Sequence, residues 1–161
     1  MIAQLAVIVW AGGLAYEDWR WRRLPNALLA AGAALGLAHW AAYGAMPFGA
    51  PMSEGAVAAA LGLVALLPFY RAGWMGAGDV KLSAVIGWLG GMQVLLAVFF
   101  AACIAAGVFA VLLLSPTCRR FMGDRSLERR LGRRVPFGVG LAVAVMVLAA
   151  GGLVQGGFRF W

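Results

Sequence analysis

The chain has 161 residues, of which 64% are hydrophobic and only 12% charged, and its mean hydropathy is +0.90. This composition excludes an ordinary soluble domain and predicts one membrane-embedded domain, residues 1–161, with room for about six helical spans. The net charge of +7 does not indicate nucleic-acid binding, because twelve of the thirteen Lys and Arg residues lie in three short gaps between apolar runs.

Apolar runs alternate with polar gaps along the whole chain. Six candidate spans follow in order: residues 1–16, 27–45, 55–70, 80–89, 92–114 and 137–154. The first run has no basic residues before it, so we expect it to remain as a transmembrane helix and not to be cleaved as a signal peptide. The fourth run, about ten residues long, is too short to cross a hydrocarbon core of roughly 30 Å. We therefore predict an all-α bundle of six transmembrane helices, with a short fourth helix that ends at Gly90–Gly91 and is buried among the others.

The distribution of positive charge predicts the orientation in the membrane. Gaps 17–26, 70–81 and 115–135 hold three, two and seven basic residues, whereas the opposite side holds only Arg159. Because Lys and Arg are retained on the cytoplasmic side, both termini are expected to be non-cytoplasmic. The arginine-rich gap 115–135 is either a solvated topology anchor or a segment that contacts anionic lipid.

Small and aromatic residues predict how the helices pack. Gly32 and Gly36, and likewise Gly55 and Gly62, have helical spacing that permits close helix contact in lipid. Most tryptophans fit interfacial belts, Trp88 among them, but Trp10 lies in mid-span and fits neither belt. His39, at the far interface, is more simply a packed or interfacial residue than a proton relay.

Cysteine and histidine give no sign of a metal centre. Cys103 lies inside an apolar run and Cys118 lies beside Arg119, without a CxxC pair or a histidine nearby in the sequence. We expect no disulfide, no metal and no cofactor.

Two acids stand at the ends of apolar helices on the side predicted to be cytoplasmic. Asp18 closes the first span and Asp79 opens the fourth. Carboxylates next to a membrane core are costly and are often functional. If the bundle brings them together, one is expected to keep its proton while the other is ionised, and such a pair can activate water to hydrolyse a peptide bond.

The segment around Asp79 has two glycines directly before the acid, Gly76 and Gly78, in the pattern GxGD. Glycine permits a tight backbone approach, and a helix N-terminus favours the ionised carboxylate. An aspartate that simply caps the helix explains the same residues.

Three segments of the chain carry a family resemblance: residues 18–26 (DWRWRRLPN), 76–82 (GAGDVKL) and 136–138 (PFG). Together they resemble type IV prepilin peptidases, since residues 76–82 look like the GxGDxKL signature of that family and residues 18–26 resemble its first motif. Pro136, Phe137 and Gly138 are similar to the Pro-Phe-Gly stretch that opens the last helix of these enzymes. The resemblance implies that Asp18 and Asp79 are the catalytic pair. It also implies that prepilin-like membrane proteins are the substrates, cut at the cytoplasmic face of the bacterial inner membrane.

The chain lacks the cysteine-rich cytoplasmic segment of the longer members of this family, which also methylate the product. It is more similar to the short peptidases of tight-adherence (Flp) pilus systems. We therefore expect an aspartic endopeptidase without methyltransferase activity.

The neighbouring residues have alternative roles. Lys81 either tunes the pair or marks topology by snorkelling, and Gly76 and Gly78 either shape a substrate loop or form a structural turn. Pro136, Phe137 and Gly138 either line a substrate groove or start a helix. The functional alternatives are a small ion- or proton-coupled membrane carrier, whose acids would bind a cation, and a scaffold subunit without chemistry.

Overall fold

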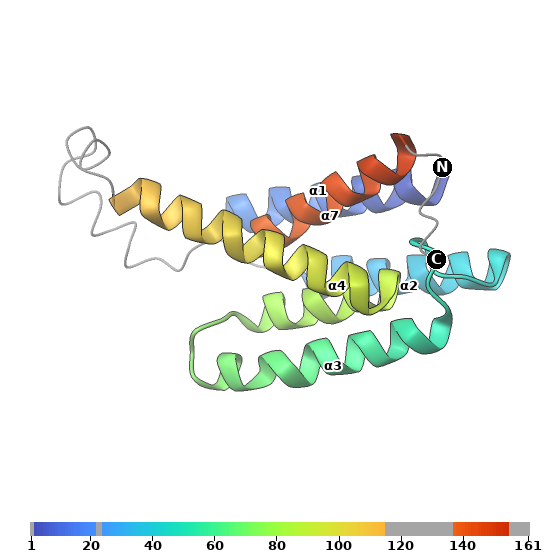
Figure 1. The fold of residues 1–161 in the computed structure, drawn as a ribbon, viewed down its shortest axis with the longest axis horizontal. Helices are drawn as coiled ribbons and strands as arrows, with labels where there is room; N and C mark the ends of the chain where they lie inside the picture. Colours follow the sequence, from blue (N-terminus) through green and yellow to red (C-terminus); the bar gives the residue numbers. More distant parts are fainter. Residues whose placement is uncertain (1, 22–23, 115–136, 155–161) are drawn as a thin grey trace.

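The computed structural model describes residues 2–21, 24–114 and 137–154, and all of its regular elements are helices. The five helices are α1 (Ile2–Trp21), α2 (Asn26–Tyr43), α3 (Met52–Arg71), α4 (Ala77–Leu114) and α7 (Phe137–Val154). They form a bundle in which α3 packs on α4, α1 packs on α7, and α4 also contacts α7 and α2 (Figure 1). The all-α prediction is confirmed.

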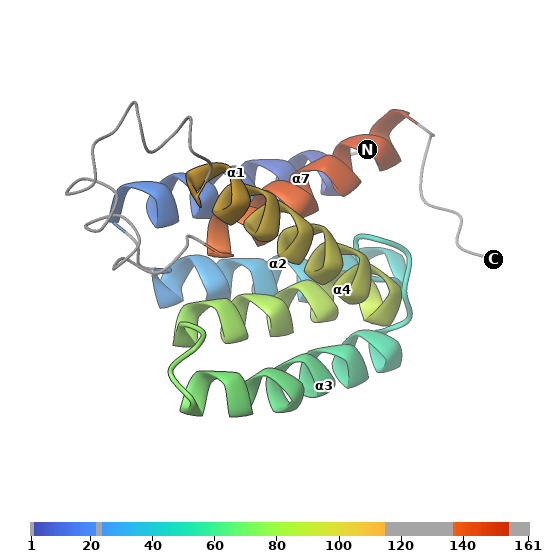
Figure 2. The same ribbon diagram turned by 60° about the vertical axis from the view of Figure 1, so that its left-hand side comes forward.

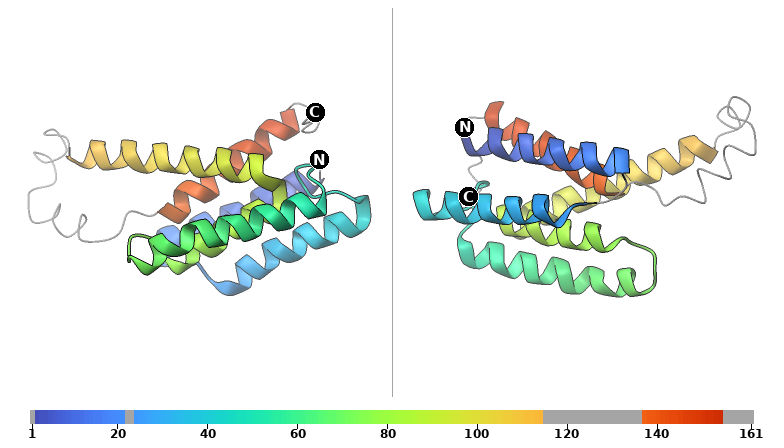
Figure 3. Two further views of the ribbon diagram at one scale, coloured as in Figure 1. Left: turned by 60° about the horizontal axis from the view of Figure 1, so that its bottom comes forward. Right: turned by 180° about the vertical axis from the view of Figure 1, so that it is seen from behind.

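Where six spans were predicted, the described residues form five helices, because the fourth and fifth predicted spans are joined in α4. Gly91 interrupts α4 with non-helical dihedral angles, φ 74° and ψ −170°, which only glycine adopts readily. The two halves of α4 diverge there, so that the first half lies beside α3 and the second half crosses toward α7 (Figures 2 and 3). The expected break at Gly90–Gly91 is thus present inside one helix.

Glu54, in the first turn of α3, supports this break. Its Oε1 accepts a hydrogen bond of 3.4 Å from the backbone N–H of Met92, the first residue after the interruption. The first N–H groups of a helical segment have no partners within the helix, so an acidic side chain stabilises them. Glu54 therefore caps the second half of α4 from a neighbouring helix.

Two helices within the described ranges are long and apolar enough to cross a membrane, Met52–Arg71 and Ala77–Val108. The chain reverses direction from helix to helix, so the ends of α1 and α3 and the starts of α4 and α7 lie at the same end of the bundle, on the left in Figure 1. Asp18 and Asp79 both belong to this end of the bundle, which is called the site end below.

Two indole rings fix α2 against the rest of the bundle. The Nε1–H of Trp10 donates to the carbonyl of Leu28 at 2.7 Å, and its ring lies against Gly32. In the same way Trp88 donates to the carbonyl of Ala33 at 3.1 Å.

Trp88 also lies against Gly36, so this tryptophan packs between helices although the sequence placed it in a belt. The glycines of α2 admit aromatic rings instead of a helix backbone. Gly55 and Gly62 of α3 do face α4, as their spacing predicted.

Candidate active site

Asp18 lies in the last turn of α1, which runs on to Trp21, beyond the end of the predicted first span at residue 16. An apolar run marks the part of a helix that faces lipid or the core, and the helix itself continues through the polar residues after it. Asp18 is buried, with 8% of its surface exposed, and faces the start of α7. Its Oδ2 accepts a hydrogen bond of 2.8 Å from the backbone N–H of Val139.

Asp79 lies in the first turn of α4 and is partly buried. Its Oδ2 accepts a hydrogen bond of 3.3 Å from the N–H of Gly76, while its own N–H donates to the Gly76 carbonyl at 3.2 Å. An acid at the third helical position that reaches back to the capping residue is the second half of a capping box. Asp79 is therefore not the N-cap residue that the sequence suggested: Gly76 holds that position, and Asp79 Oδ2 binds its N–H from the third helical position.

The other oxygen of Asp79 faces Gly138. A Cβ placed on Gly138 would lie 2.8 Å from Asp18 Oδ2 and 3.0 Å from Asp79 Oδ1. Both oxygens are thus close to one point beside α7, and their separation cannot exceed the sum of these two distances. The fold brings together two carboxylates that are 61 positions apart in the sequence, with glycine as the residue that leaves room between them.

Two helix N-termini converge on these carboxylates. Asp79 belongs to the first turn of α4, and Val139, whose N–H binds Asp18, belongs to the first turn of α7. The unsatisfied N–H groups and the dipole at a helix N-terminus stabilise negative charge. Backbone N–H groups at the starts of α4 and α7 thus lie at the carboxylate oxygens of Asp79 and Asp18.

The residues that follow Asp18 pack on the residues around Asp79. A Cβ placed on Gly78 would lie 3.0 Å from Leu24 Cβ, so a larger residue at position 78 would crowd Leu24 where it now lies. The ammonium group of Lys81 donates a hydrogen bond of 3.0 Å to Asn26 Oδ1. The LPN segment after α1 and the GxGDxK segment at the start of α4 thus form one contact region, and Lys81 takes part in it through Asn26.

Pro136, the gap 115–135 and the side chain of Phe137 lie outside the described part of the structure. Within the described part of the chain, no group of three or more His, Cys, Asp and Glu residues lies together in an arrangement that could hold a metal ion. His39 Nδ1 lies 2.8 Å from the carbonyl oxygen of Ala45, and its ring packs on Tyr43.

Sequence reasoning missed the backbone contribution to the site. The N–H of Val139 carries no side-chain signal, and its only hint in the sequence is its position just after Pro136, Phe137 and Gly138 at a helix start. The contact between Leu24 and Gly78 was not predicted either, since each residue was interpreted only within its own motif.

Comparison with protein families gives an independent result. A family model described as the type IV leader peptidase family matches residues 5–111. The matched segment contains both Asp18 and Asp79, whereas α7 lies beyond its end. Comparison with curated proteins found no match, and comparison with solved structures found none either.

Proposed function

Since the chain belongs to the type IV leader peptidase family, we propose that it is an aspartic endopeptidase in which Asp18 and Asp79 activate the attacking water. Family membership makes the chain a peptidase of prepilins. The observation that supports the aspartic mechanism is the approach of both carboxylates to Gly138. The proposed substrates are type IV or Flp-like prepilins, whose leader is removed at the cytoplasmic face without methylation of the product.

The proposed chemistry uses one carboxylate and one carboxylic acid. The ionised group takes a proton from water, whose oxygen attacks the scissile carbonyl carbon while the protonated group donates a hydrogen bond to the carbonyl oxygen. The C–N bond of the tetrahedral intermediate then breaks. The nitrogen takes up the proton that was removed from water, which leaves a carboxylic acid product, a free amine and the carboxyl pair in its starting protonation state.

Each Asp79 oxygen has its own task in this scheme. Oδ2 holds the loop through Gly76, so Oδ1, on the side of Gly138 and Asp18, is the oxygen proposed to act on substrate. The substitution Asp79→Asn can keep an oxygen acceptor for the Gly76 N–H, but it replaces the other oxygen by an NH2 group and cannot ionise. It therefore separates the catalytic role from the structural one.

We further propose how the chain lies in the membrane. It is a multi-pass protein of the bacterial inner membrane and consists of a single peptidase domain. Both termini are non-cytoplasmic, and there are six spans if the two halves of α4 are counted separately. The alternating helix directions and the basic residues Arg20, Arg71 and Lys81 near the site end support this orientation. The arginine-rich gap 115–135 is proposed to contact anionic lipid on the cytoplasmic side.

Labelling of single cysteines tests this orientation, after Cys103 and Cys118 are replaced by serine. A cysteine at Ala72, between α3 and α4, should react with a membrane-impermeant maleimide only after the cells are opened. A cysteine at Tyr43, at the end of α2, should react once the outer membrane alone is permeabilised. The reverse pattern would contradict the proposed orientation.

Cleavage of a co-expressed prepilin tests the mechanism. Asp18→Asn and Asp79→Asn should each lower the cleavage rate by at least about 10²-fold, the lower end of what positioned acid–base groups contribute. The matched control is Glu17→Gln, which removes the acid next to Asp18 in the sequence and should cleave like the wild type. Efficient cleavage by either aspartate variant would refute the proposed pair.

The family match favours this peptidase over an ion- or proton-coupled carrier. A carrier would show an ion- or pH-dependent flux across vesicles that the same two substitutions abolish. Mass spectrometry of the mature pilin provides a further check, since a methylated N-terminus produced by the purified protein would contradict the proposed absence of methyltransferase activity.

A further inference from the structure

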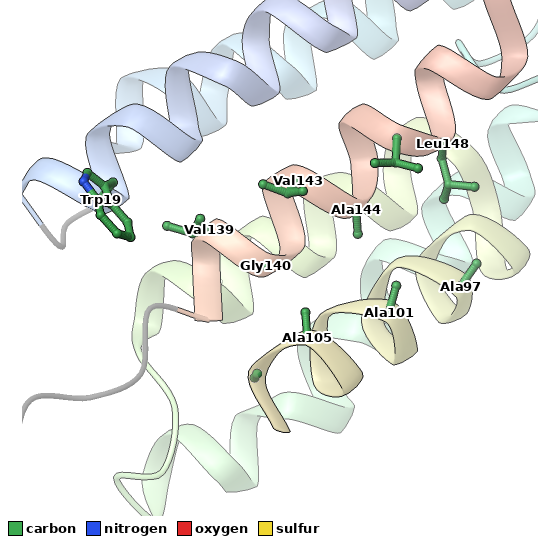
Figure 4. Close-up of a pocket in the computed structure, with 11 residues that line it drawn as sticks. Trp19, Ala97, Ala101, Ala105, Val139, Gly140, Val143, Ala144 and Leu148 are labelled. Carbon is green, nitrogen blue, oxygen red and sulfur yellow. The ribbon is translucent and has the colours of Figure 1, made fainter. Parts of the chain in front are cut away.

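An open groove of about 530 Å³ lies between α7 and the second half of α4. Its lining contains no charged residue and consists of Trp19, Ala97, Ala101, Ala105, Ala106, Val139, Gly140, Val143, Ala144, Val147 and Leu148. Figure 4 shows the α4 alanines facing the α7 side chains along its length. The groove is therefore suited to an apolar occupant.

The groove is the uncovered face of two helices whose other faces form the core. On α7, Leu141 and Val145 are fully buried, whereas Val143 and Val147 are 47% and 66% exposed. Its floor is closed where the two helices touch, since a Cβ placed on Gly140 would lie 3.6 Å from Ala102. Alanine and glycine along the walls allow a helix backbone to approach closely, as in packed membrane helices.

One end of the groove meets the candidate carboxylates. Val139, which lines that end, donates its N–H to Asp18, and Trp19, which also lines it, follows Asp18 in the chain (Figure 4). The other end lies at Leu148 on α7, nine residues further on, which is about 13 Å at the helical rise of 1.5 Å per residue. Anything that fills the groove lengthwise therefore has one end beside Asp18.

We propose that this groove binds the apolar helical segment of the substrate that directly follows the scissile bond. The inference rests on the proposed function and adds the binding surface to it. Asp18 is buried, so a peptide bond must be led to it, and a groove that ends at the Asp18–Val139 hydrogen bond provides the path. About nine helical residues fill the groove, and the chain before them passes the two carboxylates.

Lipid or a second copy of this chain can also cover an apolar face. The binding of lipid or of a second copy does not require that one end of the groove lie at the carboxylates. The binding of a substrate segment that adjoins the scissile bond does require it. The small side chains that line the groove also discriminate between substrates, because bulky side chains on the docked face of a substrate helix would collide with Ala101 and Ala105.

Two variants that fill the groove test the proposal on the full-length protein. Ala101→Phe and Ala105→Phe place a ring in the groove, and Ala60→Phe on the exposed face of α3 is the matched control. Each is assayed with a full-length prepilin and with a short soluble peptide that contains the cleavage junction but lacks the apolar segment. The groove variants should raise KM for the full-length prepilin by roughly tenfold or more and leave cleavage of the peptide unchanged.

An unchanged KM for the full-length prepilin, or equal losses on both substrates, would overturn the groove proposal. The proposed function is judged separately by Asp18→Asn, which should abolish cleavage of both substrates. If Asp18→Asn is inactive and the groove variants behave like Ala60→Phe, only the groove proposal fails.

Photocrosslinking gives a second measurement that does not depend on filling the groove. A benzophenone side chain at Val143 or Ala101 should form an adduct with the bound prepilin, whereas one at Ile104, exposed on α4 but outside the groove lining, should not. Adducts only with lipid or with a second copy of the chain would overturn the proposal.

Discussion

The backbone N–H of Val139 donates a hydrogen bond of 2.8 Å to the carboxylate of Asp18, although 121 positions separate the two residues. This bond ties the start of α7 to the end of α1. It also places Gly138 between Asp18 and Asp79, where a side chain of any size would meet both carboxylates.

Gly138→Ala should therefore impair cleavage far more than folding. The added methyl group would lie 2.8 Å and 3.0 Å from the two carboxylate oxygens, so either α7 or the carboxylates must shift. A displacement of about 1 Å in an active site can cost about 10²-fold in rate, and we expect a loss of that order in kcat. The control is Gly151→Ala on the same helix, where a Cβ has nothing within 4 Å. Equal activity of the two variants would contradict the close approach at Gly138.

Gly91→Ala should destabilise the protein. At φ 74° and ψ −170° an alanine is strained, at a cost of about 1–3 kcal/mol, and its Cβ would lie 2.7 Å from Glu54 Oε1. Thermal unfolding in detergent should show a lower Tm. Gly107→Ala, in the second half of α4 with open space around it, should be neutral or slightly stabilising. A Tm for Gly91→Ala equal to that of Gly107→Ala would argue for a continuous, unbroken α4.

Gly32→Ala should destabilise the packing of α2, because the added methyl group would overlap the indole ring of Trp10. Overpacking of this kind costs about 1–3 kcal/mol. The second substitution Trp10→Leu makes room, so the double variant should lose less stability than the sum of the two single losses. Additive losses in denaturant unfolding would show that the two residues do not meet. Gly13→Ala, with nothing within 4 Å, is the control.

The hydrogen bond between Lys81 and Asn26 should appear as a modest coupling between them. Both side chains are exposed, so a double-mutant cycle of Lys81→Ala and Asn26→Ala should give a coupling energy of about 0.5–1.5 kcal/mol in unfolding experiments. Lys81→Arg keeps a donor and should preserve part of the coupling. A coupling energy of zero would favour the alternative that Lys81 acts only as a topology marker.

The sequence determined the properties that depend on local composition and spacing. An apolar majority and short charged gaps predict an all-α membrane protein, and two glycines in succession predict the interruption that Gly91 makes in α4. Three motifs in order also predicted the family, which the match over residues 5–111 confirms. These features can be predicted from the sequence because hydropathy and helical spacing depend on only a few neighbouring residues.

Only the tertiary structure decided which distant residues meet. The residues next to Asp18 and Asp79 in the sequence do not predict that both carboxylates approach Gly138. The packing of Leu24 on Gly78 and the capping of the second half of α4 by Glu54 also depend on the tertiary structure. The groove beside α7 is likewise a product of how two helices cross. The physical reason is that a pattern of apolar residues specifies which face of a helix is covered but not which other helix covers it. The packing partner is selected by the shapes of glycine, alanine and aromatic side chains that come from separate parts of the chain.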